Sequence, residues 1–185
     1  MSLETLSKEL TGLTDDKTKK MPPIESWDPP YCGEIDLHIK ANGDWYFAGT
    51  IFKRLSLVKL FASVLLRDVG TDYDDYYLVT PVEKVKITVA DAPFVLTQWA
   101  WQDHTETHMM VSTNVDDAFV LDQAHPLLVS KEGELYVNVR RNLQAKVHRN
   151  VYYQWVALAK EVQTAKGTEL IFSSAGTDFS LGLIS

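Results

Sequence analysis

Two stretches of the chain carry the same hairpin-like pattern, and this repetition limits the possible folds more than any other feature. The first is HIKANGDWYFAGT (38–50), and the second is LVSKEGELYVNVR (128–140). In both, apolar residues alternate with polar ones around a short turn that ends in glycine, as in an antiparallel hairpin. Gly43 and Gly133 lie 90 positions apart. A pattern that recurs at a fixed distance indicates a repeated structural unit.

The register of the first hairpin follows from which residues its faces must separate. An Asn-Gly turn of two residues would pair Ile39 with Tyr46 and mix charged and apolar side chains on each face. A three-residue loop (41–43), with Gly43 left-handed, instead pairs Ile39 with Trp45. Apolar and polar faces then separate, as a half-buried sheet requires. We therefore predict the three-residue loop.

The second hairpin supports the same register. Glutamate is unfavourable at positive φ, so its Glu-Gly tip argues against a two-residue turn, and the loop 131–133 pairs Val129 with Leu135. Tyr136 then falls on the outer face, as Tyr46 does in the first copy. The two tyrosines either form a shared contact surface or cover the edges of their sheets.

A helix and a pair of strands follow each hairpin. The first helix, with Ser56 as its expected N-cap, has a stripe formed by Leu57, Leu60, Phe61, Val64 and Leu65. The second, with Asn150 as its expected N-cap, has Val151, Trp155, Leu158 and Val162 on one face. The order strand, strand, helix, strand, strand thus occurs twice. We interpret this as an internal duplication; two unrelated units are the alternative.

These observations predict an α+β protein with two β-rich subdomains of the hairpin–helix–hairpin type. The first repeat domain spans 22–93, and the second spans 94–185 and includes a linking β meander. Residues 1–21 form an N-terminal helical arm, whose apolar stripe consists of Leu3, Leu6, Leu10 and Leu13. We expect the arm to dock on its own domain rather than on a partner.

Charge and motifs exclude several common functions. The net charge of −7 argues against broad, sequence-independent nucleic-acid binding. The single cysteine, and the absence of a signal pattern or a long apolar run, favour a cytoplasmic protein without a membrane span. No phosphate-binding, dinucleotide-binding or nucleophile-elbow motif occurs. We therefore predict no cofactor and no catalytic residues.

Two segments superficially resemble metal sites. HTETH (104–108) spaces two histidines by four residues, but the zinc-protease pattern places glutamate directly after the first histidine. TDYDD (71–75) lacks the glycine and the distal glutamate of a calcium loop. We predict no metal site and interpret 104–108 as a hairpin turn.

A local excess of positive charge occurs between 131 and 150, around Arg140 and Arg149. Arg54 occupies the comparable position in the first half, where strand leads into helix. Such cations can bind an anionic group, or they form a solvated face with weak internal ion pairs.

Several strings carry a family resemblance: WDPP (27–30), DWYF (44–47), VTPVEK (79–84) and DAPF (91–94). Together with their surroundings they resemble the bacterial family called domain of unknown function 1285, over nearly all of 22–182. The resemblance implies a duplicated two-domain β-rich fold, with a C-terminal half loosely similar to pleckstrin-homology-like domains. It implies no established activity, and it favours a groove between the domains as the binding location.

The family pattern also indicates candidate binding residues. Its ligand-capable positions, together with the two hairpin tyrosines, are Trp27, Asp28, Tyr46, Arg54, Glu83, Lys84, Asn114, His125, Tyr136, Arg140 and Arg149.

We therefore expect a non-enzymatic binding or adaptor protein that uses the cleft between the repeats, with a role in signalling and a protein as partner. One alternative is an enzyme or small-molecule receptor in that cleft, with His125, Glu83 and Asp91 as candidates for proton transfer. The other is nucleic-acid binding by the patch from Arg140 to Arg149. The oligomeric state is not predicted.

Overall fold

The computed structural model describes residues 3–14, 21–70 and 72–184. The chain divides into two compact units, 1–91 and 92–185, which are described in turn. The protein is β-rich, with three α-helices among the described residues.

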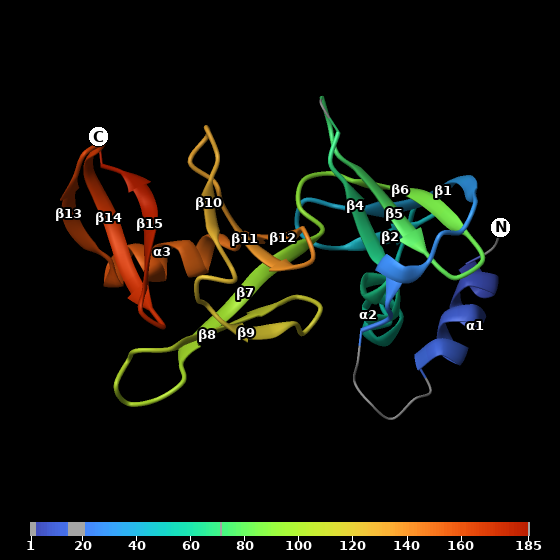
Figure 1. Ribbon diagram of the computed structural model, residues 1–185, viewed down its shortest axis with the longest axis horizontal. Helices are drawn as coiled ribbons and strands as arrows, with labels where there is room; N and C mark the ends of the chain where they lie inside the picture. Colours follow the sequence, from blue (N-terminus) through green and yellow to red (C-terminus); the bar gives the residue numbers. More distant parts are fainter. Residues whose placement is uncertain (1–2, 15–20, 71, 185) are drawn as a thin grey trace. The chain divides into compact units, whose positions relative to one another are not determined.

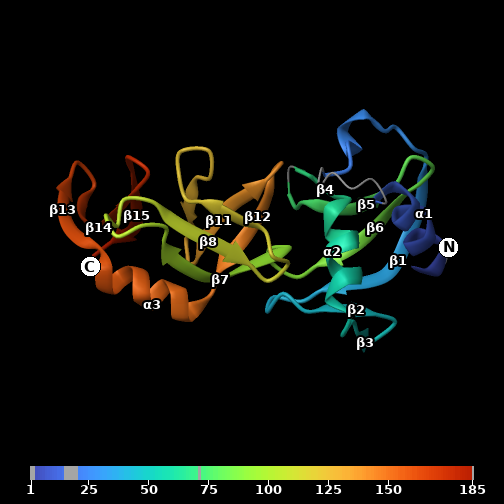
Figure 2. The ribbon, with the colours of Figure 1, turned by 90° about the horizontal axis from the view of Figure 1, so that it is seen from below.

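The N-terminal unit is one mixed sheet with two helices. Its elements are α1 (Leu3–Thr14), a short 3-10 turn η1 (Ile24–Ser26), β1 (Tyr31–Ile39), β2 (Trp45–Phe47), β3 (Thr50–Ile51), α2 (Leu55–Ser63), β4 (Leu65–Asp68), β5 (Asp75–Val79) and β6 (Lys84–Val89). The strands form a six-stranded sheet, sheet A, in the order β3-β2-β1-β6-β5-β4. Helices α1 and α2 contact each other and cover one face of this sheet (Figures 1 and 2).

The core of this unit lies between sheet A and its helices. Trp45 from β2 and Phe61 from α2 are fully buried there. Leu6 and Leu10 of α1 are buried in the same unit and α1 contacts α2, so the helix packs on its own domain. The rest of the expected N-terminal arm, 15–20, lies outside the described residues.

Both hairpins have the predicted register. In the first, Ile39 pairs with Trp45, and Gly43 closes the loop at a φ of 88°. In the second, Val129 pairs with Leu135, and the φ of Gly133 is 82°. The separation of apolar from polar faces was thus sufficient to choose between two turn types.

The C-terminal unit contains two sheets and one helix. Its elements are β7 (Phe94–Trp101), β8 (Met109–Thr113), β9 (Ala118–Val120), β10 (Leu127–Val129), β11 (Leu135–Arg140), β12 (Leu143–Val147), α3 (Arg149–Leu158), β13 (Lys160–Thr164), β14 (Gly167–Ser174) and β15 (Thr177–Leu183). Sheet B has the order β10-β11-β12-β7-β8-β9, and the three-stranded sheet C has the order β13-β14-β15.

The two units repeat one strand order. Read from β9, sheet B runs 9-8-7-12-11-10, which matches 3-2-1-6-5-4 in sheet A. In each sheet two meanders meet at a central parallel pair, β1 with β6 and β12 with β7. Hairpin β10–β11 therefore corresponds to β4–β5 rather than to β1–β2. The two halves are similar, but Tyr46 and Tyr136 do not occupy equivalent strands.

Both predicted helices end earlier than their apolar stripes. Helix α2 ends at Ser63, whose hydroxyl donates to the carbonyl of Leu60 at 2.6 Å and so competes with the helical backbone bonds. Helix α3 ends at Leu158. The residues expected to continue the two helices form β4 and β13 instead. The strand pairs β5–β6 and β14–β15, which follow the helices, therefore each have a third strand.

The predicted helix starts also differ from those observed. The residue before α2 is Arg54, which makes no side-chain cap, so Ser56 is not the N-cap. His148 caps α3, and its ring accepts a hydrogen bond from the backbone N–H of Asn150.

Helix α3 fixes sheet C within the C-terminal unit. Its buried Trp155 packs on Phe172 of β14 at 5.1 Å between ring centroids, and Phe172 stacks on Phe179 of β15 at 5.5 Å. We call these three rings the aromatic column. At the tip of the β14–β15 hairpin, the N–H of Ala175 donates to the carbonyl of Thr107 at 2.7 Å. Both contacts hold sheet C near the tip of its β14–β15 hairpin.

Gly133 gives a clean test of the loop geometry, because a Cβ added there would touch nothing within 4 Å. Gly133→Ala should destabilise the protein by about 1–2 kcal/mol, the cost of a left-handed non-glycine residue. Gly133→Asn should lose clearly less, since asparagine tolerates this conformation. Urea unfolding followed by circular dichroism measures both. Equal stabilities for wild type and Gly133→Ala would contradict the assigned loop.

Candidate functional site

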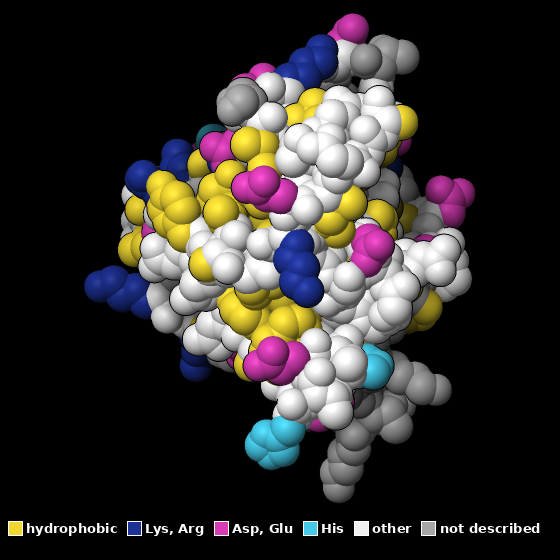
Figure 3. Space-filling view, turned by 90° about the vertical axis from the view of Figure 1, so that its left-hand side faces the viewer, with side chains coloured by type: hydrophobic (Ala, Val, Ile, Leu, Met, Phe, Trp, Pro, Cys, Tyr) yellow, Lys and Arg dark blue, Asp and Glu magenta, His cyan; other side chains and the backbone are white. Residues whose placement is uncertain are grey.

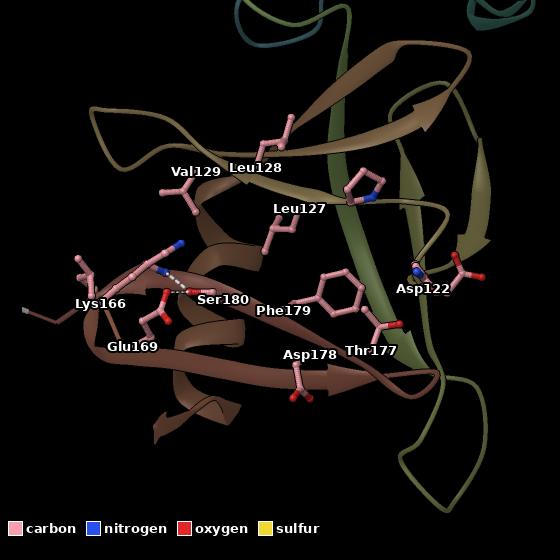
Figure 4. Close-up of a pocket in the computed structure, with 14 residues that line it drawn as sticks. Asp122, Leu127, Leu128, Val129, Lys166, Glu169, Thr177, Asp178, Phe179 and Ser180 are labelled. Carbon is pink, nitrogen blue, oxygen red and sulfur yellow. Dashed lines mark hydrogen bonds between the residues drawn. The ribbon is translucent and has the colours of Figure 1, made fainter. Parts of the chain in front are cut away.

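The candidate site is a groove between β10 and β15, edge strands of sheets B and C that contact each other (Figure 4). Its volume is about 610 Å³, within the usual range for ligand-binding pockets. The apolar part of its lining comes from Pro126, Leu127, Leu128, Val129, Phe179, Gly182 and Leu183.

The floor of the groove is apolar. Leu127 and Val129 point from β10 toward β15, whereas Leu128 points away (Figure 4). Phe179, the last ring of the aromatic column, lies against the same space. Val129 is 43% exposed and Leu128 45% exposed, so the lining remains open to solvent.

The backbone of β10 is unpaired on the edge away from β11. The N–H of Ser130 donates to the carbonyl of Glu134, and the N–H of Asn138 donates to the carbonyl of Pro126. In an antiparallel ladder the bonded pairs alternate, so Leu128 also bonds β11. The N–H and C=O groups of Leu127 and Val129 therefore point outward, and no hydrogen bond reaches them from the described part of the chain.

Strand β15 also presents an unpaired edge. The same alternation, counted from the Ala175-Gly176 turn, directs the backbone groups of Asp178 and Ser180 away from β14. Gly182 lies opposite Val129: a Cβ there would sit 3.8 Å from the Val129 Cγ1 atom. Because residue 182 is glycine, no side chain enters the groove at this point.

The rim of the groove is mainly acidic. Carboxylates of Asp122, Glu169 and Asp178 line it, against the one ammonium group of Lys166. Hydrogen bonds from the hydroxyls of Thr164 and Ser180 lower the pKa of Glu169, so its carboxylate stays ionised. The groove thus combines an apolar floor with a rim of negative charge.

The surrounding surface is also partly apolar. Figure 3, seen from the side of sheet C, shows apolar areas separated by single charged side chains. Leu183 and Ile184 are exposed at the end of β15, next to the groove.

None of the residues predicted from the sequence lines this groove. Tyr136 pairs with Leu128 on the face turned away from it, and His125 lies beside Pro126. One sequence feature could have indicated the groove, namely the uninterrupted apolar run of β10. An edge strand with one face in solvent is expected to alternate apolar and polar residues.

In the N-terminal unit, the predicted residues occupy separate places. Trp27, half-buried, follows η1, and Asp28 beside it is exposed. Tyr46 pairs with His38 on the outer face of sheet A, where the Lys40 ammonium lies 5.6 Å from its ring centroid. Arg54 is exposed at the start of α2.

Lys84 makes the closest cation–ring contact of this unit, with its Nζ atom 4.1 Å from the centroid of Tyr77. Tyr31 meets Tyr77 edge-to-face at 6.2 Å. These residues form a small exposed aromatic cluster that includes one predicted site residue.

Glu83 lies close to a second carboxylate. Burial, and then the negative charge of Glu9 on α1, raise the pKa of Glu83. Its Oε1 atom and Oε2 of Glu9 are buried without a hydrogen-bond partner among the described residues. A negative charge on Glu83 is therefore disfavoured by its burial and by the carboxylate of Glu9.

In the C-terminal unit, the side chain of Arg140 contacts residues of the same unit. Its guanidinium contacts the carboxylate of Asp117 at 3.2 Å and lies 4.8 Å from the ring centroid of Phe94. Burial lowers the pKa of Arg140, while Asp117 opposes this change, and an arginine stays charged in either case. Both side chains are largely buried, so the pair stabilises sheet B.

The remaining predicted residues also have local partners. Asn114 exchanges hydrogen bonds with the backbone of Val95, each at 2.9 Å. His125 bonds the carbonyl of Asn138 through Nδ1, and its ring stacks on Phe119. Arg149 donates to the Tyr153 hydroxyl.

Neither metal ligation nor a membrane span is indicated for the described residues. They contain no group of three or more potential metal ligands. The segment 104–108 lies on the loop between β7 and β8. No helix in the described ranges is both long and apolar enough to cross a bilayer.

Comparison with known families accounts for both units. A family model described as domain of unknown function (DUF1285), N-terminal domain, matches residues 22–92. A second, protein of unknown function (DUF1285), C-terminal domain, matches residues 93–181. The chain belongs to the DUF1285 family. The resemblance found in the sequence is thereby confirmed.

Solved structures of DUF1285 proteins agree with this assignment. One, from Silicibacter pomeroyi DSS-3, is 31% identical, covers 95% of each chain and has a TM-score of 0.77. Another, from Shewanella baltica OS155, is 29% identical over 66% of this chain and 91% of its own, with a TM-score of 0.53. No curated protein matches the chain.

The Arg140–Asp117 pair predicts a stability effect. Arg140→Ala should destabilise the protein by about 1.5–3 kcal/mol, because a partly buried carboxylate loses charged hydrogen bonds. Adding Asp117→Ala should cost clearly less than the sum of the single effects. The exposed Arg149→Ala is the control, expected within about 0.5 kcal/mol of wild type. Urea unfolding measures wild type, the two single variants, the double variant and the control; additive effects would show that the pair is not coupled.

Proposed function

We propose that this DUF1285 protein is a non-enzymatic binding protein that takes a protein partner in the groove between β10 and β15. The observation that carries the proposal is an uncovered apolar floor beside an unpaired strand edge. Exposed, contiguous apolar surface of this kind marks sites of protein interaction.

The character of the groove favours a protein segment over a nucleic acid. Its rim is mainly acidic, which repels phosphates, and its floor consists of aliphatic side chains and one phenylalanine. Arg140, at the centre of the nucleic-acid alternative, is engaged by Asp117.

Other expectations stay predictions from the sequence and its resemblance. They are the adaptor role, a place in signalling, a cytoplasmic location, a site between the two repeats and a pleckstrin-homology-like C-terminal half. The alternative of an enzyme or small-molecule receptor also stays a prediction.

The groove is tested with a displayed library of random heptapeptides selected on the whole protein. We expect enriched peptides to bind wild type and to bind Val129→Asp at least about tenfold more weakly, because a buried charge opposes the apolar contact. Val162→Asp is the matched control. Val162 is 40% exposed on the edge strand β13, outside the groove.

Circular dichroism must first show that both variants are folded. Enriched peptides that bind wild type and both variants equally would place binding elsewhere. A library that yields no binder would contradict the proposed function itself.

A further inference from the structure

We propose that the partner presents a loop to the groove, in which one large apolar side chain enters between Leu127 and Phe179 and a neighbouring lysine or arginine contacts the carboxylate of Asp122. This inference rests on the proposed function and specifies the chemistry by which the partner is recognised.

The shape of the groove favours a single side chain over an extended segment. At one end the two strands are in contact, since a Cβ at Gly182 would lie 3.8 Å from the Val129 Cγ1 atom. No segment can therefore run between β10 and β15 along their whole length. Leu127 and Phe179 line the groove farther along, toward Asp122 (Figure 4). A partner reaches this part from solvent, with a side chain first.

The lining at this point suits an apolar side chain. Leu127 and Pro126 contribute from β10 and the residue before it, and Phe179 contributes from β15. The Phe179 ring stacks on Phe172, so its position is fixed before a partner arrives. Fixed walls reduce the ordering cost of binding. Pockets of this kind hold the anchoring side chains of protein partners.

A second, shallow hollow adjoins the groove at Asp122. Its volume is about 580 Å³, and its lining consists of Asp122, Gln123, Ala124, Ala175, Gly176 and Thr177. Asp122, Gln123 and Thr177 line both the groove and this hollow. Asp122 is the one charged residue in the lining of the second hollow. A side chain that enters the hollow therefore lies next to one that fills the groove.

The charge of Asp122 determines which side chain suits the second hollow. Its Oδ1 atom accepts the N–H of Ala124 at 2.9 Å, and the carboxylate forms no ion pair with another residue of the described ranges. Arginine or lysine there gains a charge-assisted hydrogen bond. A carboxylate of the partner would be repelled by both Asp122 and Asp178 on the rim.

The test begins with the heptapeptides that are selected on the whole protein. We expect the enriched sequences to contain a leucine, methionine or phenylalanine with a lysine or arginine within two positions of it. Selection on Asp122→Asn should keep the apolar residue and lose the preference for the basic one. Asparagine can still accept the N–H of Ala124, so this substitution removes the charge alone.

The matched control is Glu132→Gln. Glu132 is an exposed carboxylate in the loop between β10 and β11, outside both hollows. Selection on this variant should enrich the same sequences as selection on wild type.

The strongest heptapeptide from the wild-type selection is then titrated by fluorescence anisotropy. Replacing its apolar residue by alanine should weaken binding at least about tenfold. Replacing its basic residue by glutamine should weaken binding to wild type and to Glu132→Gln at least about fivefold. The same replacement should change binding to Asp122→Asn by less than about twofold, because the opposing charge is already absent.

The outcomes separate this inference from the proposed function. Equal losses for wild type and Asp122→Asn on the glutamine replacement overturn the contact between the basic residue and Asp122. A peptide that tolerates alanine at its apolar residue overturns the anchor. In either case, peptides that still depend on Val129 leave the groove as the site, and only the inference is wrong. If no heptapeptide binds, both proposals fail.

Discussion

The stacking of Trp155 on Phe172 is the contact on which the candidate site depends. It ties α3 to β14, and the aromatic column continues to Phe179 on β15. Because α3 also reaches β7, where the indole N–H of Trp99 donates to Gln154 at 2.8 Å, the helix sets the position of sheet C against sheet B. Strands β10 and β15 contact each other as a result, and they are not hydrogen-bonded to each other in the described structure.

Unpaired edges are normally protected in natural sheets. Strand β13 shows such protection, since it begins with Lys160 and Glu161 and its residues are largely exposed. Strand β10 differs, because its three residues are all apolar. An edge of this kind risks nonspecific association unless a partner covers it. This contrast within one unit supports recognition at β10.

The register of both hairpins could be predicted from the sequence, because the separation of apolar from polar faces depends only on the local alternation of residues. It also predicted the similarity of the two halves, but it aligned hairpin β1–β2 with β10–β11. Which meanders join into one sheet depends on the distant parallel pairs of β1 with β6 and of β12 with β7. Residues 65–68 and 160–162, which were expected to continue the two helices, form strands for a related reason, since pairing with neighbouring strands outweighs helical periodicity.

The candidate site could not be predicted from the sequence. It depends on the position of an unpaired strand edge in the folded unit, and side-chain motifs carry no information about that position. Arg140 and His125 were predicted as binding residues because their side chains can bind ligands, yet both have partners inside their own unit. The groove instead consists of residues that resemble ordinary core positions, such as Leu127 and Phe179.

Amide hydrogen exchange of β10, resolved by NMR, tests whether the edge of this strand is unpaired, and it requires no ligand. We predict that the amides of Leu127 and Val129 exchange at least about tenfold faster than that of Leu128, which bonds β11. Equal protection of all three amides would show that the β10 edge is already paired, and would contradict the open groove.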